Sequence, residues 1–297
     1  MLYGLIGVSG FALTLPATKA VVPYMDPIFI GFGRAAVAAV VSVALLLLFR
    51  QRIPNLKQIN QLIWVVLGVI VGFPILTSWA MQYVPASHGG VVLGILPLAT
   101  AIAGAFIGGE RPSVSFWVVS VLGGALVVTY TVLQGPAGFH IADFALVGAI
   151  FSAAIGYAVG GKLSKEIGGW QTICWALILA FPFVVLPAFE RSPEDLSNIP
   201  LSGYIGFFYL ALVSQLFAFF VWYKGLALGG IAKVSQAQLL QPFITLLGSV
   251  FLLRETIEPE TILFMLLVVL SVWLGKKMPV REKFNNPNQP TAEVSSD

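Results

Sequence analysis

Charged side chains are scarce in this chain, and their scarcity decides the class of protein. Only 10% of the 297 residues are charged, whereas 58% are hydrophobic, and the mean hydropathy is +0.92. Soluble domains carry about 25% charged and roughly 45–50% apolar residues, so a water-soluble fold is excluded. Apolar stretches long enough to cross a bilayer follow one another along the chain. We therefore expect an all-α polytopic membrane protein whose main partner is the lipid bilayer.

Several groups that common chemistries need are missing. The chain has one cysteine, Cys174, which excludes an intramolecular disulfide and a thiolate metal cluster. It has two histidines and contains neither a His-Glu-x-x-His helix nor a Walker-type phosphate loop, which argues against a zinc protease and an ATP-driven pump. We expect no cofactor, no metal and no nucleic-acid partner. We also expect no enzymatic activity, with an intramembrane enzyme as the remote alternative.

Aspartate and glutamate are absent from the middle of every predicted span. The acidic residues close to the predicted spans all fall at span ends or in loops: Asp26, Glu110, Asp143, Glu166, Glu190, Glu255 and Glu258. Proton-driven carriers commonly relay protons through a buried carboxylate. We therefore predict facilitated transport down the substrate gradient, with proton coupling through an unconventional group such as His88 as the alternative.

Hydropathy, read with proline, glycine and charge as boundaries, predicts ten spans. They lie near residues 2–22, 28–49, 60–83, 85–107, 113–133, 141–163, 170–189, 202–223, 231–253 and 259–276. The first lacks a basic leader and a small-residue cleavage site, so we interpret it as a permanent span rather than a signal peptide. Residues 278–297 are mostly polar and are expected to form a disordered cytoplasmic tail.

Lysine and arginine are distributed unequally between the two sides of the predicted bundle. With the amino terminus in the cytoplasm, twelve fall on the inner side: Arg50, Arg52, Lys57, Arg111, Lys162, Lys165, Lys224, Lys233, Lys276, Lys277, Arg281 and Lys283. Only Lys19, Arg191 and Arg254 fall on the outer side. Since short cytoplasmic loops are enriched in basic residues, this bias predicts a multi-pass protein of the cell inner membrane with both termini cytoplasmic.

The two halves of the chain resemble each other. The segment at 96–111 reads LPLATAIAGAFIGGER and the segment at 241–256 reads QPFITLLGSVFLLRET, so a proline, a threonine and a glutamate recur 145 residues apart. Each half holds five predicted spans, an odd number, so the second half must enter the membrane from the opposite face. We predict two inverted five-helix repeats, residues 1–135 and 136–277, with substrate bound between them.

These features resemble the EamA branch of the drug/metabolite transporter superfamily. The resemblance is carried by Ala80–Glu110 and Gly225–Glu255, each with a small residue, an uncharged hinge, an apolar helix with a midway proline and a terminal glutamate. The family implies ten helices with an internal duplication, cytoplasmic termini and export of amino acids or other metabolites. The chain looks most like the exporters of aromatic and other neutral amino acids. Multidrug or other metabolite export is the alternative, and ten helices can enclose a path in a monomer.

Polar side chains at membrane depth are costly and usually face protein or a water-filled cavity. On the ninth predicted span, Gln238, Gln241 and Thr245 recur at helical spacing, and Gln236 lies nearby. We predict that these residues line a cavity and hydrogen-bond the substrate, with interhelical hydrogen bonding as the alternative. The equivalent stretch of the fourth span would give the cavity an apolar wall, and its substrate-binding candidates are Leu93 and Leu96.

Further candidates lie at the junction of the third and fourth predicted spans. They are Trp79, Gln82, Tyr83, Ser87 and His88, and two aromatic residues of the second half, Tyr157 and Trp175, join them. Histidine titrates near physiological pH and can carry a proton or contact a substrate, so we assign His88 to the cavity. Aromatic residues at span ends commonly anchor a protein at the membrane interface, which is the alternative for Trp79 and Tyr83.

Arg34 is the deepest cation, about two turns into the second predicted span. Long basic side chains in a membrane reach toward the interface or pair with backbone carbonyls, and we expect Arg34 to do one of these. Binding a substrate carboxylate is the alternative. Lys19 and Lys162, at matching ends of the first and sixth spans, are expected to be topology anchors or gate residues.

Overall fold

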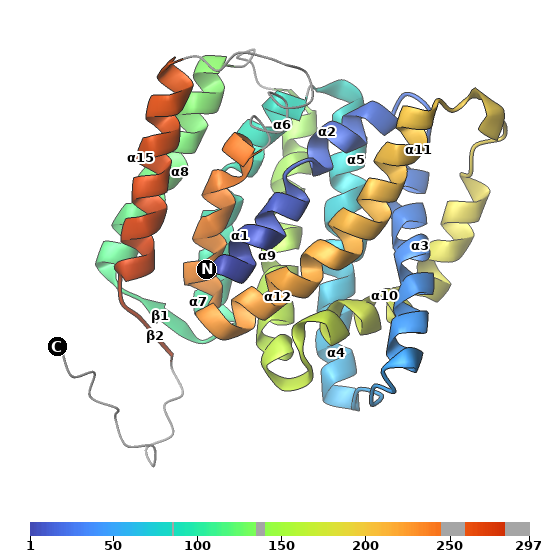
Figure 1. Ribbon diagram of the computed structural model, residues 1–297, viewed down its shortest axis with the longest axis horizontal. Helices are drawn as coiled ribbons and strands as arrows, with labels where there is room; N and C mark the ends of the chain where they lie inside the picture. The colour runs from blue at the N-terminus through green and yellow to red at the C-terminus, as the bar shows by residue number, and fades with distance from the viewer. Residues whose placement is uncertain (85, 135–139, 245–258, 283–297) are drawn as a thin grey trace.

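A computed structural model describes most of the chain, and it is helical almost throughout (Figure 1). The described residues are 1–84, 86–134, 140–244 and 259–282. Helices prevail because a helix satisfies its own backbone hydrogen bonds where no water is present to do so. Within the described part, six helical segments are long and apolar enough to cross a membrane: Leu2–Val21, Pro27–Leu48, Leu56–Tyr83, Ala142–Ile167, Gly169–Glu190 and Leu201–Gly229. The chain is an all-α polytopic membrane protein.

The elements of the first half are α1 (Leu2–Phe11), α2 (Thr14–Val21), α3 (Pro27–Leu48), α4 (Leu56–Val65), the π-helix η1 (Val66–Gly72), α5 (Phe73–Tyr83), α6 (Ala86–Leu93), α7 (Leu96–Phe106), strand β1 (Glu110–Pro112) and α8 (Val114–Gln134). The second half contains α9 (Ala142–Ile167), α10 (Gly169–Glu190), the short 3-10 helix η2 (Leu196–Asn198), α11 (Leu201–Phe208), the π-helix η3 (Tyr209–Phe217), α12 (Ala218–Gly229), α13 (Ile231–Ser235), the 3-10 helix η4 (Gln236–Leu240), α15 (Pro259–Lys277) and strand β2 (Val280–Glu282).

The connections alternate between two faces of the molecule (Figure 1). The α3–α4 turn, the two strands, the α9–α10 turn and the α12–α13 turn lie at one end, which we call the strand face. The α2–α3, α5–α6 and α10–α11 connections lie at the other end, the loop face. Arg50 follows α3, and Lys165 and Lys276 lie in the last turns of α9 and α15, all at the strand face. Lys19 ends α2 and Arg191 follows α10 at the loop face. For these five residues the division is the one that the sequence predicts, and Arg254 and Lys283 lie outside the described part.

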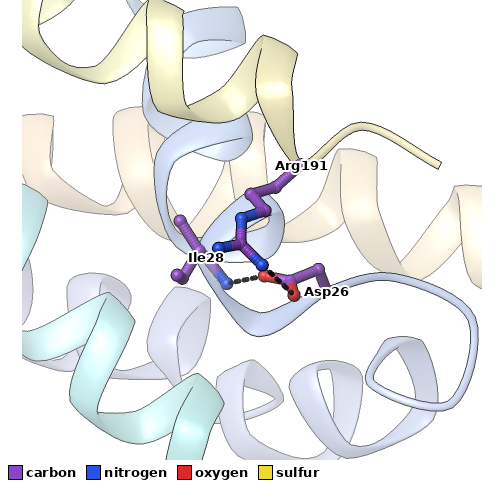
Figure 2. A network of polar contacts seen from close by, with 3 residues as sticks. All are labelled: Asp26, Ile28 and Arg191. Carbon is purple, nitrogen blue, oxygen red and sulfur yellow. Dashed lines mark hydrogen bonds and ion pairs between the residues drawn. The ribbon is translucent and has the colours of Figure 1, made fainter.

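At the loop face, Asp26 caps the N-terminus of α3 (Figure 2). The carboxylate of Asp26 accepts a 2.7 Å hydrogen bond from the backbone N–H of Ile28, and Pro27 occupies the first helical position. Nη1 of Arg191 lies 3.9 Å from the other Asp26 oxygen, with the two side chains 58% and 36% exposed. An exposed pair of this kind contributes little to stability. It does show that the connections after α2 and after α10 lie side by side.

The two halves pack backbone to backbone at glycines. Gly68 and Gly72 in η1 and Gly156 and Gly160 in α9 are spaced four residues apart, which predicts close helix contact. A Cβ atom added to Gly68 would lie 2.7 Å from the Cα of Gly156, so a larger residue has no room. The Oγ of Ser152 on α9 also donates a 2.9 Å hydrogen bond to the carbonyl of Gly68. Helix α9 is therefore held tightly against the first half.

The start of the polar tail differs from the expectation of disorder. Strand β2 pairs antiparallel with β1, placing Arg281 opposite Arg111, and Ser113 donates a 3.0 Å backbone hydrogen bond to Pro279. A three-residue strand whose partner is far away in sequence leaves no local hydrophobic pattern, so hydropathy does not predict it. Residues 283–297 lie outside the described part.

Candidate functional site

Several of the predicted spans are interrupted. The first divides between α1 and α2, the fourth divides between α6 and α7, and the ninth begins as α13 followed by the 3-10 helix η4. Two further spanning segments, Leu56–Tyr83 and Leu201–Gly229, contain the π-helices η1 and η3. Irregular backbone at membrane depth is tolerated where it is buried in protein or lines a cavity, and π-helical turns often mark functional sites. A ligand site is therefore expected in the space between the interrupted helices.

A cavity of about 410 Å³ lies at these interruptions. Its wall includes Ala12 between α1 and α2, Gly94 between α6 and α7, Val69 of η1, Ser214 of η3 and Gln238 of η4. The volume falls in the roughly 300–1,000 Å³ range that small-molecule sites occupy. Both halves of the chain supply the wall, so the cavity lies between them.

Two glutamines present amide groups to this cavity. Gln238 is 5% exposed, and neither atom of its amide group has a hydrogen-bond partner among the described residues. Gln241, one turn further, donates a long 3.5 Å hydrogen bond to the carbonyl of Phe11 at the end of α1. A buried amide without partners costs about 1–3 kcal/mol, and a molecule in the cavity can supply the missing bonds.

Arg34 also faces the cavity, which corrects the expectation for this residue. Its side chain is 2% exposed and donates a 3.1 Å hydrogen bond from Nη2 to the hydroxyl of Ser214, so it does not reach the interface, and it binds no backbone carbonyl of the described residues. The Ser214 hydroxyl in turn lies 2.8 Å from the hydroxyl of Thr14, and both line the cavity. The expectation failed because the η3 hydroxyl that receives Arg34 is distant in sequence.

Aromatic rings form an apolar wall. The ring centroid of Phe11 lies 6.4 Å from that of Tyr157 and 5.0 Å from that of Phe219, and all three residues line the cavity. Trp222 is fully buried behind them, 6.0 Å from Phe11 and 5.4 Å from Tyr157. Such a wall suits an apolar or aromatic body.

The described lining of the cavity carries a positive charge that no acidic residue of that lining balances. Arg34 is the ionised side chain of its described lining, and no aspartate or glutamate of that lining accompanies it. Across the described ranges, no group of three or more histidine, cysteine, aspartate or glutamate side chains could hold a metal ion. The arrangement therefore offers a positive charge, hydroxyls, amides and aromatic rings for non-covalent binding.

Five of the predicted site residues meet in this cavity. They are Leu93, Leu96, Tyr157, Gln238 and Gln241, from four different elements and the segment after η4. Gln236 lies in η4 but is buried at 1% exposure outside the lining. Two of the predicted amides, Gln238 and Gln241, thus share one cavity with the predicted leucines.

The remaining candidates lie elsewhere. Trp79 and Tyr83 on α5 are 37% and 53% exposed with their ring centroids 4.8 Å apart, and Gln82 between them is exposed, so all three lie on the outside of the molecule. Trp175 on α10 lines a separate shallow hollow with Ile53. Three candidates cannot be placed: the side chains of Ser87 and His88 lie outside the described part, and so does all of Thr245.

Sequence reasoning missed other lining residues. Thr14 and Ser214 are hydroxyls within apolar runs, and the cost of polar groups at membrane depth was a usable signal for them. Phe11, Tyr130 and Phe219 gave no such signal, because an aromatic residue that faces a cavity has the same sequence environment as one that faces lipid.

A charged side chain caps a helix end at each face. At the strand face, the carboxylate of Glu110 accepts hydrogen bonds from the backbone N–H groups of Ile231 (2.6 Å) and Ala232 (2.7 Å), which begin α13. At the loop face, Nζ of Lys19 donates to the carbonyls of Met81 (2.8 Å) and Val84 (3.1 Å) at the end of α5. Both charges match the helix dipole at the end they cap. The Lys19 contact joins α2 and α5, which both contribute to the cavity wall, and the Glu110 contact holds α13, which leads directly into the cavity-lining helix η4.

Comparisons with known proteins agree with this architecture. The model of the EamA-like transporter family matches residues 1–131 and 140–275. A protein described as "Uncharacterized transporter YdeK" from Bacillus subtilis (strain 168) is 41% identical over 274 residues, covering 92% of this chain and 96% of that protein. "Uncharacterized transporter YyaM" from the same organism is 25% identical over 295 residues, covering 94% and 95%. A chain of a solved crystal structure, 16% identical, covers 93% of this chain and 97% of its own length with a TM-score of 0.73, which shows a shared fold.

Proposed function

The chain belongs to the EamA-like transporter family, and from this premise we propose that it exports small metabolites, neutral or aromatic amino acids among them, through the cavity between its two halves. The proposed architecture is ten transmembrane helices in two inverted five-helix repeats. Two observations support it: the family model matches the chain twice, at 1–131 and 140–275, and the connections alternate between two faces.

The cavity between the two halves is the observation that carries the proposal. It combines the unpartnered amide of Gln238 with an aromatic wall that includes Tyr157 and Phe219. In the proposed complex, the amide binds the polar groups of the substrate and the aromatic wall takes its apolar side chain. Both halves of one chain line this cavity, so the proposed transport path requires only a monomer.

Transport by alternating access requires that the cavity open to one face at a time. Two caps are suited to this. Breaking the Lys19 cap at the loop face frees the end of α5, a helix that borders the cavity. Breaking the Glu110 cap at the strand face frees the start of α13, which leads into the cavity-lining helix η4. We assign the strand face to the cytoplasm, because the short basic connections lie there, and both chain termini with it. The movement is proposed to be facilitated, since the described lining has no carboxylate to relay a proton.

Counterflow in proteoliposomes tests the proposal. Vesicles that contain the purified protein and a high internal concentration of phenylalanine should take up external radiolabelled phenylalanine. Gln238→Leu should slow this exchange at least about tenfold, because it removes the hydrogen bonds that the amide is proposed to make with the substrate. Gln82→Leu, at an exposed site outside the cavity lining, is the matched control. No exchange of any member of a panel of neutral amino acids would refute amino-acid transport.

The orientation has its own test. An epitope placed in the connection after Pro54, between α3 and α4, should be reached by antibody only after the cell membrane is permeabilised. Detection on intact cells would reverse the proposed topology and with it the assignment of the strand face.

A further inference from the structure

Arg34 is an uncompensated cation inside the cavity. It is 2% exposed, it makes one hydrogen bond, to Ser214, and its Nε and Nη1 atoms have no hydrogen-bond partner among the described residues. No aspartate or glutamate lies in the described lining around it. A buried charge is costly unless it is paired with an opposite charge and hydrogen-bonded. In the described lining Arg34 has one hydroxyl partner and no opposite charge. A negatively charged group in the cavity would supply the missing partner.

We infer that Arg34 binds the carboxylate of the transported molecule, and that the cavity selects small organic monoanions with an apolar body over the corresponding amines. The inference rests on the proposed function, because it assigns one group of the carried molecule to this cavity. A guanidinium offers five N–H donors in a planar fork that matches a carboxylate. The hydroxyls of Thr14 and Ser214 lie beside it on the cavity wall, 2.8 Å apart, and because one donates to the other, one hydroxyl proton remains as a further donor.

The same lining gives little recognition to an ammonium group. An ammonium has three donors and no acceptor, and its strong partners are ionised carboxylates. The described lining offers neutral acceptors such as the amide oxygen of Gln238. The aromatic wall of Phe11, Tyr157 and Phe219 takes the apolar body. A carboxylate without an amino group should therefore bind at least as tightly as the corresponding amino acid.

Anion selectivity gives facilitated export a driving force. A monoanion that crosses without a proton carries one negative charge outward in each cycle. The membrane potential, negative inside, favours this direction and supports a gradient of roughly fiftyfold per 100 mV. A carrier of this kind needs no proton-relaying carboxylate, which agrees with the lining.

Three probes that differ only in their charged groups test the inference without any substitution. They are 3-phenylpropanoate, which has a carboxylate alone, L-phenylalanine, which has a carboxylate and an ammonium, and 2-phenylethylamine, which has an ammonium alone. Their affinities for the purified full chain in lipid nanodiscs are measured by titration calorimetry. We expect 3-phenylpropanoate to bind at least as tightly as phenylalanine and at least about tenfold more tightly than 2-phenylethylamine, because charge-assisted hydrogen bonds of this kind change affinity by ten- to a hundredfold.

Substitutions then locate the effect. Arg34→Met should weaken both carboxylates by about ten- to a hundredfold and leave 2-phenylethylamine unchanged, and Arg34→Lys should retain part of the carboxylate affinity because it keeps the charge but loses the fork. Arg191→Met removes an exposed arginine at the loop face and should change nothing. Equal or tighter binding of the amine, an absence of saturable 3-phenylpropanoate binding, or full carboxylate affinity in both Arg34 variants would overturn the inference.

Binding and flux separate this inference from the proposed function. If carboxylates bind through Arg34 but none of the probes crosses reconstituted vesicles, the anion site stands and transport of these molecules fails. If phenylalanine exchanges across vesicles at the same rate in wild type and Arg34→Met, transport stands and the anion site fails.

Discussion

The carboxylate of Glu110 should hold the strand face closed. It lies at 4% exposure and accepts two short hydrogen bonds from the first N–H groups of α13. Hydrogen bonds to a charged group contribute about 1.5–3 kcal/mol each, and buried N–H groups that lose their acceptor are not rescued by water. We expect Glu110→Gln, which keeps one acceptor oxygen, to lower the free energy of unfolding by about 2 kcal/mol, and Glu110→Ala to lower it by about 4 kcal/mol.

Two measurements check this expectation. Titration with a denaturing detergent gives the free energy of unfolding, and Glu166→Gln, the same change at an exposed glutamate, is the control. Opening at the strand face is measured by introducing Ile231→Cys, a position buried at 1% under the cap, and following its reaction with a membrane-impermeant maleimide. The native Cys174 is fully buried, so its background reaction is slow.

The labelling rate should follow the opening equilibrium. A loss of about 2 kcal/mol corresponds to labelling about thirtyfold faster in the Glu110→Gln background. If Glu110→Gln and Glu110→Ala matched the wild type in both unfolding and labelling, the carboxylate would not close this face, and the reasoning from its two hydrogen bonds would be refuted.

Three further predictions concern packing, the loop face and coupling. Gly156→Ala should lower the free energy of unfolding by about 1–3 kcal/mol in the detergent titration, because the added Cβ meets η1, whereas Gly124→Ala, whose Cβ would meet nothing within 4 Å, should not. Lys19→Met should lower it by about 1–3 kcal/mol through the loss of two carbonyl contacts, with Arg191→Met as the unchanged control. An imposed pH gradient should not drive uphill uptake of phenylalanine into proteoliposomes, and strong uphill uptake would exclude facilitated transport.

The helical nature of the chain and the division of its basic residues between two faces could be predicted from the sequence. Both follow from the properties of lipid as a solvent: apolar runs must be helical, and basic residues such as Arg50 and Lys165 must lie at or beyond the ends of helices. Gln238 and Gln241 could be predicted for the same reason, because an amide at membrane depth is costly unless it faces protein or a water-filled cavity.

What the sequence could not provide was the geometry between distant segments. The breaks after Phe11 and Leu93 and the π-helical turns depend on how helices meet, and no local pattern marks them. Arg34 was recognised as unusual but assigned to the wrong surroundings, because Ser214 is 180 residues away. Aromatic residues such as Phe219 escaped entirely, since burial against a cavity and burial against lipid favour the same side chain.

The pairing of α8 with α15 has a consequence for how the molecule is divided. These are the last helices of the two halves, they pack along each other in a cluster that includes Val127, Val268 and Val272, and β1 and β2 join their neighbouring ends (Figure 1). Units that rock against each other would have to keep this pair intact, so in the proposed alternating-access movement the moving units would not coincide with the proposed repeats. A chimaera joined between α8 and α9 would exchange one partner of the pair without the other, and it would function only if both parents share the same seam.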